Sequence, residues 1–313
     1  MSENFLICIK AVAPMFIMII VGYLVRLSGM VNDDELNKFN KMVFHTLFPM
    51  LMFSNIYHAD IREIVDIRLI IFAVAAVFAV YFTGMAIAVK TEKSSRSRGA
   101  LIQAIYRSNF VIMGLPIATN IYGHSNVGVT AVMVAIIVPI FNVLAVITLE
   151  TYKGSAVNPR KIVMGIVTNP LIIGIIIGLV FSLLSIPLPG ILEDTVSEIS
   201  AAANPMALII LGASFRTGGV RECRKNLITA VLMRLVIVPG IVLTVAMLLG
   251  IKGIAFVTLV SIFAAPCAIS SFTMALEMKS DANLAGNAVI FTSAFSCFTM
   301  FGWLLLFKSM GVF

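Results

Sequence analysis

The sequence predicts an all-α polytopic membrane protein, and three observations support this prediction. Hydrophobic residues make up 60% of the 313-residue chain, charged residues only 12%, and the mean hydropathy is +1.06. A soluble domain of ordinary composition is about 45–50% apolar. The apolar stretches are also long, and they lack the alternation of apolar and polar residues that is typical of membrane β-strands.

Ten segments are long enough to cross a bilayer, which takes about 20 apolar residues. They are predicted at 5–27, 34–57, 67–89, 100–122, 127–149, 161–184, 192–215, 226–249, 254–278 and 283–307. The connections are short, so we expect no separate soluble domain. The first segment lacks a basic flank and is too long for a cleavable signal. The four cysteines show no metal or redox spacing, so we expect no disulfide, metal or cofactor.

The basic residues predict the orientation of the chain. Fifteen of the 22 lysines and arginines lie in loops that follow odd-numbered segments, five lie on the other side, and Arg107 and Arg234 lie inside segments. Because cytoplasmic loops carry the excess of Lys and Arg, the odd loops should be cytoplasmic and both termini should face outward. This loop bias also accounts for the formal charge of +7, so we expect no nucleic-acid partner.

The prolines indicate an internal repeat. Pro14 and Pro49 are 35 residues apart, and so are Pro170 and Pro205, so that an offset of 156 relates the two pairs. The halves are therefore 1–152 and 158–313. Each half holds five segments, an odd number, so the second half should be inserted upside down relative to the first.

Segments 4 and 9 each contain helix-breaking residues. Segment 4 holds the stretch 107–117 and segment 9 the stretch 263–272, with Pro116 and Pro266 related by an offset of 150. Proline removes a backbone donor, and freed backbone groups inside hydrocarbon need cover from protein or a watery cavity. We therefore expect helices 4 and 9 to break at these prolines and to cross at the membrane midplane, where secondary transporters bind substrate.

Eight residues at or beside these breaks are predicted to bind substrate. They are Arg107, Asn109, Gly114, Pro116, Asn142, Pro266, Ser270 and Ser271. The amide of Asn109 can bind a carboxylate or only cap the break. The guanidinium of Arg107 can pair with a carboxylate, snorkel toward the cytoplasm, or pair with segment 8 or 9. The serines can satisfy freed carbonyls or touch substrate, and Asn142 can serve helix packing alone.

Two further polar residues inside segments receive structural interpretations. We expect Arg234 to snorkel toward the cytoplasm and His45 to be a satisfied core histidine. No Asp or Glu falls at a predicted midplane, which disfavours proton exchange through a protein carboxylate. Helix N-termini beyond Pro116 and Pro266, together with Asn109, would then bind an anion.

Short motifs give the chain a resemblance to the auxin efflux carrier family. They are Asn109 with Gly114-Leu115-Pro116, then Leu211-Gly212-Ala213-Ser214, and Pro266 followed by Asp281, Leu284 and Ala285. The resemblance implies a scaffold of segments 1, 2, 6 and 7, and a transport domain of segments 3–5 and 8–10 that moves as an elevator. The bacterial branch, which includes malate and malonate permeases, implies the inner membrane of a bacterium. We also expect a homodimer through the scaffold.

The predicted function is a secondary transporter of a small organic anion, a mono- or dicarboxylate. A sodium-coupled symporter of the bile-acid transporter type remains an alternative, because unwound carbonyls can bind sodium without a carboxylate. An enzyme is disfavoured, because the segments hold no His-Glu-x-x-His, intramembrane aspartate pair or Gly-x-Ser-x-Gly. A channel is disfavoured as well, because a channel needs no pseudo-symmetric site at the midplane.

Overall fold

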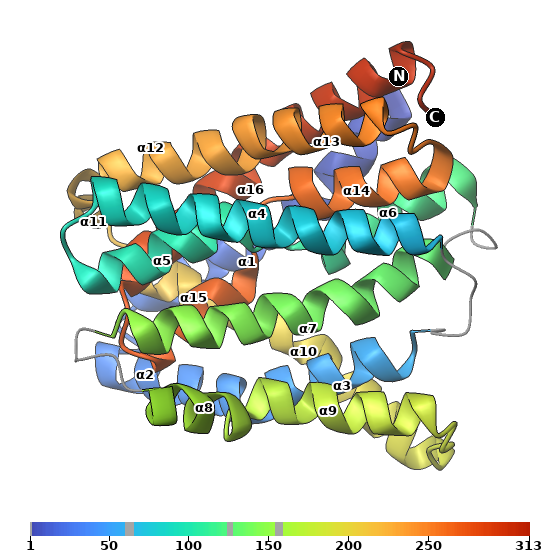
Figure 1. Ribbon diagram of the computed structural model, residues 1–313. Coiled ribbons are helices and arrows are strands. Elements are labelled where there is room, and N and C mark those ends of the chain that lie inside the picture. Colours follow the sequence, from blue (N-terminus) through green and yellow to red (C-terminus); the bar gives the residue numbers. More distant parts are fainter. Residues whose placement is uncertain (1, 60–65, 124–127, 154–158) are drawn as a thin grey trace.

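The computed structural model describes residues 2–59, 66–123, 128–153 and 159–313, and within these ranges the chain is built from helices (Figure 1). In chain order they are α1 (Ser2–Leu27), α2 (Asp33–Met42), η1 (Val43–Leu47), α3 (Phe48–Tyr57), α4 (Ile67–Thr91), α5 (Ser95–Tyr106), α6 (Phe110–Tyr122), α7 (Gly128–Thr151), α8 (Pro159–Val167), α9 (Pro170–Leu183), α10 (Gly190–Ser214), α11 (Thr217–Glu222), α12 (Arg224–Leu232), η3 (Met233–Ile237), α13 (Val238–Leu248), α14 (Gly253–Ala264), α15 (Ile269–Glu277) and α16 (Ala282–Ser309). Apart from one isolated antiparallel bridge, the described residues form no strand.

Five helices among the described residues are long and apolar enough to cross a membrane. They are α4, α7, α10, the continuous run from α12 to α13, and α16. Shorter apolar helices include α6, α9 and α14. The all-helical architecture agrees with a polytopic membrane protein, although several of the expected segments are divided into shorter helices.

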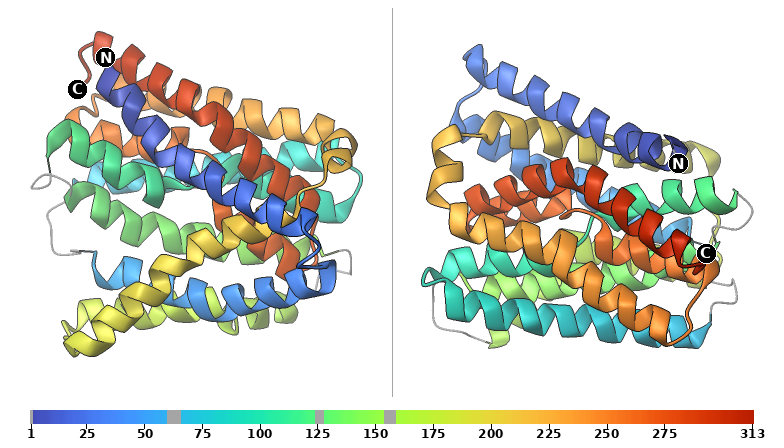
Figure 2. Two further views of the ribbon diagram at one scale, coloured as in Figure 1. Left: turned by 180° about the vertical axis from the view of Figure 1, so that it is seen from behind. Right: turned by 90° about the horizontal axis from the view of Figure 1, so that it is seen from above.

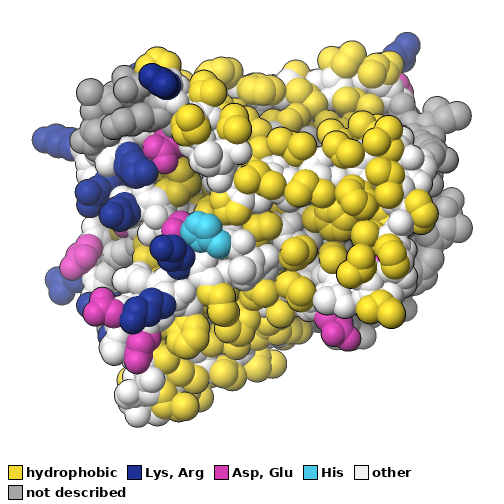
Figure 3. Space-filling view, turned by 90° about the horizontal axis from the view of Figure 1, so that it is seen from below, with side chains coloured by type: hydrophobic (Ala, Val, Ile, Leu, Met, Phe, Trp, Pro, Cys, Tyr) yellow, Lys and Arg dark blue, Asp and Glu magenta, His cyan; other side chains and the backbone are white. Residues whose placement is uncertain are grey.

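The surface separates apolar and charged side chains. Figure 3 shows apolar side chains over most of one face, with Lys, Arg, Asp and Glu gathered mainly at its left end. The turns from α1 to α2 and from α4 to α5, and helix α11, lie at that end, whereas both termini lie at the opposite end (Figures 1 and 2). The charge asymmetry found in the sequence therefore corresponds to two ends of the molecule.

Glycines allow two pairs of helices to pack closely. A Cβ atom at Gly22 of α1 would collide with the carbonyl oxygen of Ile209 in α10, and one at Gly212 with that of Ile19. Gly174 of α9 approaches the backbone of α3 in the same way. Small residues let helix backbones approach closely in membranes. The pairs α1–α10 and α3–α9 thus join four helices that correspond to the expected scaffold segments.

Each of the two described π-helical turns, η1 and η3, precedes a proline in the first turn of the next helix. Pro49 follows η1 and Pro239 follows η3. A proline lacks the N–H that would bond the carbonyl four residues earlier, which is Leu235 for Pro239. The indole Nε1 of Trp303 donates to that Leu235 carbonyl at 2.9 Å. This contact fixes η3, the turn that carries Arg234, against α16.

Two helices are interrupted where they meet. Residues 107–109 separate α5 from α6, and residues 265–268 separate α14 from α15. Ser108 and Cys267 form the isolated antiparallel bridge between the two interruptions. We call residues 107–109 and 265–268 together the crossing.

The first interruption does not lie at the expected proline. Pro116 lies inside α6 and is exposed, whereas Pro266 lies within the crossing. The paired residues Ser108 and Cys267 are 159 positions apart, an offset that differs from the 150 between Pro116 and Pro266. The prediction that helix 4 breaks at Pro116 is therefore wrong. A proline inside a helix removes one hydrogen bond and kinks it, but here the pairing of two distant backbones sets the interruption.

Candidate functional site

Main-chain hydrogen bonds tie the two interruptions together. The N–H of Asn109 donates to the carbonyl of Pro266 at 2.8 Å, and the N–H of Ala268 donates to the carbonyl of Arg107 at 3.4 Å. Inside a membrane, non-helical backbone is tolerated where protein supplies such partners. The crossing is thus a defined structure with its own pairing.

A cavity of about 60 Å³ lies at the crossing. Helices α3 and α10 line one side, and α6, α7, the start of α15 and the crossing line the other. Its polar lining residues are Asn55, Arg107, Ser108, Asn109, Asn142, Asn204 and Ser270, and none of its described lining residues is Asp or Glu. A cavity of this volume has room for a few water-sized groups.

Arg107 places a positive charge at the wall of this cavity. The residue is 2% exposed, and its Nη1 donates to Gln103 Oε1 at 3.1 Å and to the Sδ of Met274 at 2.8 Å. Its Nη2 donates to Asn142 Oδ1 at 2.7 Å, and the Asn142 amide donates in turn to the Val138 carbonyl at 2.9 Å. All of these acceptors are neutral. A buried charge without an opposite charge is costly, so this guanidinium is suited to receive an anion.

Two helix N-termini add to the positive character of the cavity. Asn109 and Ala268 precede α6 and α15, and neither helix receives a side-chain cap. A helix N-terminus carries roughly half a positive charge and binds anions through its free N–H groups. The Asn109 Nδ2 and Ser108 Oγ are buried and have no hydrogen-bond partner among the described residues. The cavity therefore combines positive charge with unused donors.

The structure brings together four of the eight predicted residues in the cavity lining. These are Arg107, Asn109, Asn142 and Ser270. The other four lie elsewhere. Pro266 accepts the backbone bond within the crossing, and Ser271 is buried beyond the cavity lining.

Gly114 and Pro116 are the two of these four residues that lie within α6. A Cβ atom at Gly114 would lie 2.8 Å from Phe110 and 3.2 Å from Ser261, so this glycine serves the packing of α6 against α14. Pro116 is exposed on α6. Neither residue is in the described cavity lining, because the interruption lies at 107–109, before α6 begins.

Three polar residues of the lining were not predicted as site residues from the sequence. Ser108 lies between two predicted site residues, and Asn55 and Asn204 come from α3 and α10. Asn55 and Asn204 are amides inside apolar segments, which is a recognised signal for a functional position. Only the fold, however, could show that α3 and α10 face the crossing.

The expectations for Arg234 and His45 are both wrong. Arg234 is 0% exposed, so it does not snorkel, because main-chain carbonyls at the crossing surround its guanidinium. The side chain of His45 is 44% exposed and lies on the outer side of η1, with Nδ1 2.9 Å from the Lys41 carbonyl. It is therefore not a core histidine.

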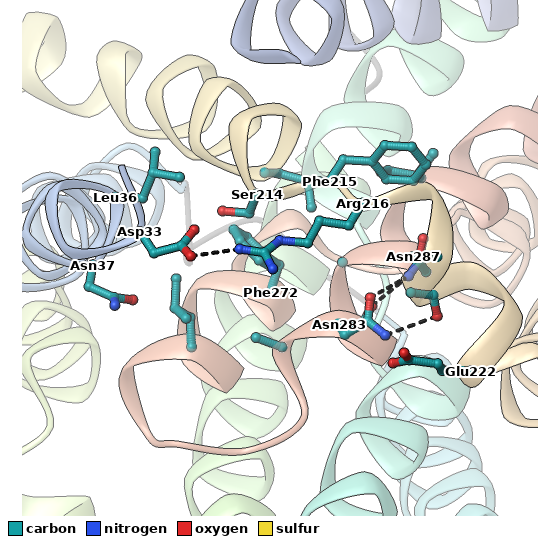
Figure 4. A pocket seen from close by; sticks show the side chains of 17 residues that line it. Asp33, Leu36, Asn37, Ser214, Phe215, Arg216, Glu222, Phe272, Asn283 and Asn287 are labelled. Atoms are coloured by element: carbon teal, nitrogen blue, oxygen red, sulfur yellow. Dashed lines mark hydrogen bonds and ion pairs between the residues drawn. The ribbon is translucent and has the colours of Figure 1, made fainter. Parts of the chain in front are cut away.

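A second cavity, of about 510 Å³, lies near the Lys- and Arg-rich end between α2 and α10 on one side and α15 and α16 on the other. Figure 4 shows Asp33 and Arg216 facing each other at one side of it and Asn283 and Asn287 at the other. The Arg216 Nη2 donates to Asp33 Oδ2 at 2.6 Å. This hydrogen bond, with the charges of Arg216 and Arg26, holds the pKa of the Asp33 carboxyl below its usual value.

These features define a polytopic helical membrane protein with a positively charged polar cavity between two groups of helices. The chain belongs to the membrane transport protein family, whose sequence pattern matches residues 7–162 and 155–304. The resemblance to the auxin efflux carrier family is thereby confirmed, and the chain is a membrane transporter.

Two relatives agree with this assignment. An uncharacterized transporter of Methanothermobacter thermautotrophicus is 21% identical over 297 residues, covering 94% of this chain and 96% of that protein. An uncharacterized transporter of Methanocaldococcus jannaschii is 22% identical over 316 residues, covering 96% of this chain and all of that protein. The similarity extends over the whole chain, so it concerns the complete fold.

Proposed function

We propose that this chain is a secondary transporter of a small organic anion, a mono- or dicarboxylate, that binds at the crossing. The supporting observation is the charge of the cavity. Arg107 has only neutral partners there, two helix N-termini point to the same place, and no described lining residue is acidic. A bound carboxylate would supply the missing negative charge, and a guanidinium binds carboxylates with two parallel hydrogen bonds.

The unused donors define how the anion would be held. The Asn109 Nδ2 and Ser108 Oγ would donate to the carboxylate from the crossing, and the Ser270 hydroxyl would donate from the first turn of α15. A volume of about 60 Å³ suits a small head group rather than a bulky amphiphile. This favours a small carboxylate over a bile-acid-like substrate.

We further propose ten membrane segments arranged as two inverted repeats of five, 1–152 and 158–313. The two family matches overlap at 155–162, close to the proposed boundary. The packing supports the same division, because α1 pairs with α10 as α9 pairs with α3. Exchange of the two halves converts one pair into the other. Inverted repeats with a site near the midplane are a recurrent design of secondary transporters.

Transport would proceed by movement of one group of helices against the other. The scaffold would comprise α1–α3 and α8–α10, and the transport domain α4–α7 and α12–α16. The cavity at the crossing and the cavity of about 510 Å³ both lie between these groups. The larger cavity would be the cytoplasmic access, and Asn55 and Asn204 would contact the anion from the stationary side.

The proposed setting is the cytoplasmic membrane, with the termini outside and a homodimer formed through the scaffold. The Lys- and Arg-rich end would face the cytoplasm.

Cys223 is buried, so the exposed neighbour Arg224 is the better reporter of orientation. In an Arg224→Cys variant, a membrane-impermeant thiol reagent should label the new cysteine only after the cells are opened. Labelling in intact cells would reverse the orientation.

The deciding experiment measures uptake of labelled mono- and dicarboxylates into liposomes that contain the purified protein. Asn109→Ala should weaken binding at least about tenfold, because each lost hydrogen bond to a charged group contributes about 1.5–3 kcal/mol. Pro170→Ala is the matched control, since Pro170 begins α9 away from the cavity. If both variants bind like the parent, the site is not at the crossing. A dependence of uptake on a sodium gradient would favour the sodium-coupled alternative.

A further inference from the structure

Arg234 is the second fully buried arginine among the described residues, and its guanidinium donates hydrogen bonds to main-chain carbonyls. Its Nε donates to the carbonyl of Ala265 at 2.8 Å, and its Nη2 to that of Ile262 at 2.7 Å. Its Nη1 donates to the carbonyls of Tyr106 at 3.1 Å and Ile105 at 3.4 Å. One side chain of η3 therefore reaches both interrupted helices.

The four carbonyls belong to the ends of two helices. Ile105 and Tyr106 are the last residues of α5, while Ile262 lies in the last turn of α14 and Ala265 directly follows it. The last four carbonyls of a helix have no partner within that helix. Arg234 supplies donors to the carbonyls of both helix ends at once.

The charges at this point balance. A helix C-terminus carries roughly half a negative charge, so the C-termini of α5 and α14 together offset the single positive charge of Arg234. The planar guanidinium presents five donors in a fixed fork, which a lysine ammonium does not reproduce. The opposite ends of the same breaks, the N-termini of α6 and α15, remain unbalanced beside Arg107.

The position of Arg234 is itself fixed. It lies in the π-helical turn before Pro239, and Trp303 holds the neighbouring Leu235 carbonyl from α16 at 2.9 Å. A π-turn adds a residue to the helix and is frequently found at functional sites. The side chain therefore projects from a braced turn and not from a regular helix.

We propose that Arg234 is a positioning residue: it holds the C-terminal ends of α5 and α14 together and thereby sets where the N-termini of α6 and α15 converge. The expected effect of Arg234 on anion affinity rests on the proposed function, whereas its expected effect on the backbone structure of the crossing does not. Arg234 is not among the residues that line the cavity, and its hydrogen bonds go to main-chain carbonyls, so it would act through the backbone.

The test separates these two effects by measuring amide hydrogen exchange together with binding of a labelled dicarboxylate. In purified Arg234→Gln, peptides that cover residues 105–109 and 265–268 should exchange at least about tenfold faster than in the parent. A tenfold change corresponds to about 1.4 kcal/mol. Anion affinity should fall in parallel, and Arg234→Lys, which keeps the charge but loses the fork, should be intermediate in both measurements.

Arg107→Gln is the matched control, since it also removes a buried arginine. It should lose anion binding while exchange at the two segments changes less than about threefold. Parent-like exchange in Arg234→Gln would overturn the proposal. If Arg234→Gln does not fold, hydrogen exchange is measured in Arg234→Lys. Parent-like exchange at both segments in that variant would also overturn the proposal. If the parent binds no carboxylate, the proposed function fails, while the exchange rates still decide the role of Arg234.

Discussion

Arg107 and Arg234 are both buried between apolar helices, and neither has an acidic partner among the described residues. Their surroundings differ. Arg234 donates only to main-chain carbonyls at two helix ends, which the fold keeps in place. Arg107 donates to the side chains of Gln103, Asn142 and Met274, beside a cavity. We therefore propose that Arg234, whose charge is balanced by two helix dipoles, holds the structure, whereas Arg107, which has only neutral side-chain partners, binds the ligand.

The largest expected effect is the loss of anion binding in Arg107→Gln. Removing one partner of a buried charged hydrogen-bonded pair costs about 2–5 kcal/mol, which corresponds to a loss of affinity of about thirtyfold or more. Equilibrium binding of a labelled dicarboxylate to the purified protein measures this. Arg216→Gln, at the exposed end of the molecule, is the control and should change affinity less than about threefold. Parent-like binding by Arg107→Gln would remove the distinction between the two buried arginines.

A smaller effect is expected at Pro266. Its ring restricts the segment 265–268, so Pro266→Ala should let that segment sample more conformations and weaken binding about two- to fivefold. Pro116→Ala should leave affinity within about twofold, because Pro116 is exposed on α6 outside the cavity. Isothermal titration of both variants checks this, and equal losses would mean that the kink of α6 also shapes the site.

A still smaller effect is expected at the exposed ion pair of Asp33 and Arg216, which contrasts with the two buried arginines. The pKa of Asp33 is lowered by the hydrogen bond from Arg216, so the pair stabilises the fold above the ordinary pKa of 3.8. This stability is lost as pH falls through the lowered folded pKa. Since Asp33 is largely exposed, Asp33→Asn should cost well under about 1 kcal/mol at pH 7. Thermal unfolding at pH 7 and pH 3 measures the difference, which should shrink at pH 3.

No effect on the pH profile is expected from His45→Gln. The charge at the cavity resides on a guanidinium, which keeps its proton across the physiological range, so pH should act through protonation of the substrate. His45 lies on the outer side of η1, with Nδ1 4.0 Å from Glu277 Oε1, and it does not line the cavity. Uptake rates between pH 5 and pH 8 provide the test. A flattened profile in this variant would make His45 the proton site.

The local sequence was sufficient for the membrane class and for four of the residues that line the cavity at the crossing. Long apolar segments indicate membrane spans, and the uneven distribution of Lys and Arg indicates their orientation. Polar residues inside such segments are costly in the membrane, so they mark candidate functional positions. For this reason Arg107, Asn109, Asn142 and Ser270 could be selected without the structure. The resemblance to the family followed from short motifs, one of which contains Asn109.

Only the tertiary structure decided where helix 4 breaks and what Arg234 does. The interruption at 107–109 depends on backbone pairing with Cys267 and Pro266, more than 150 residues away, whereas the local sequence pointed to Pro116. Arg234 likewise meets carbonyls of α5 that lie 128 and 129 residues earlier in the chain. Hydropathy and propensity report the cost of placing a residue in the membrane, but they cannot report which distant backbone groups offset it. That choice arises when the helices pack, and it leaves Arg234 among main-chain carbonyls and Arg107 among neutral side chains beside the cavity.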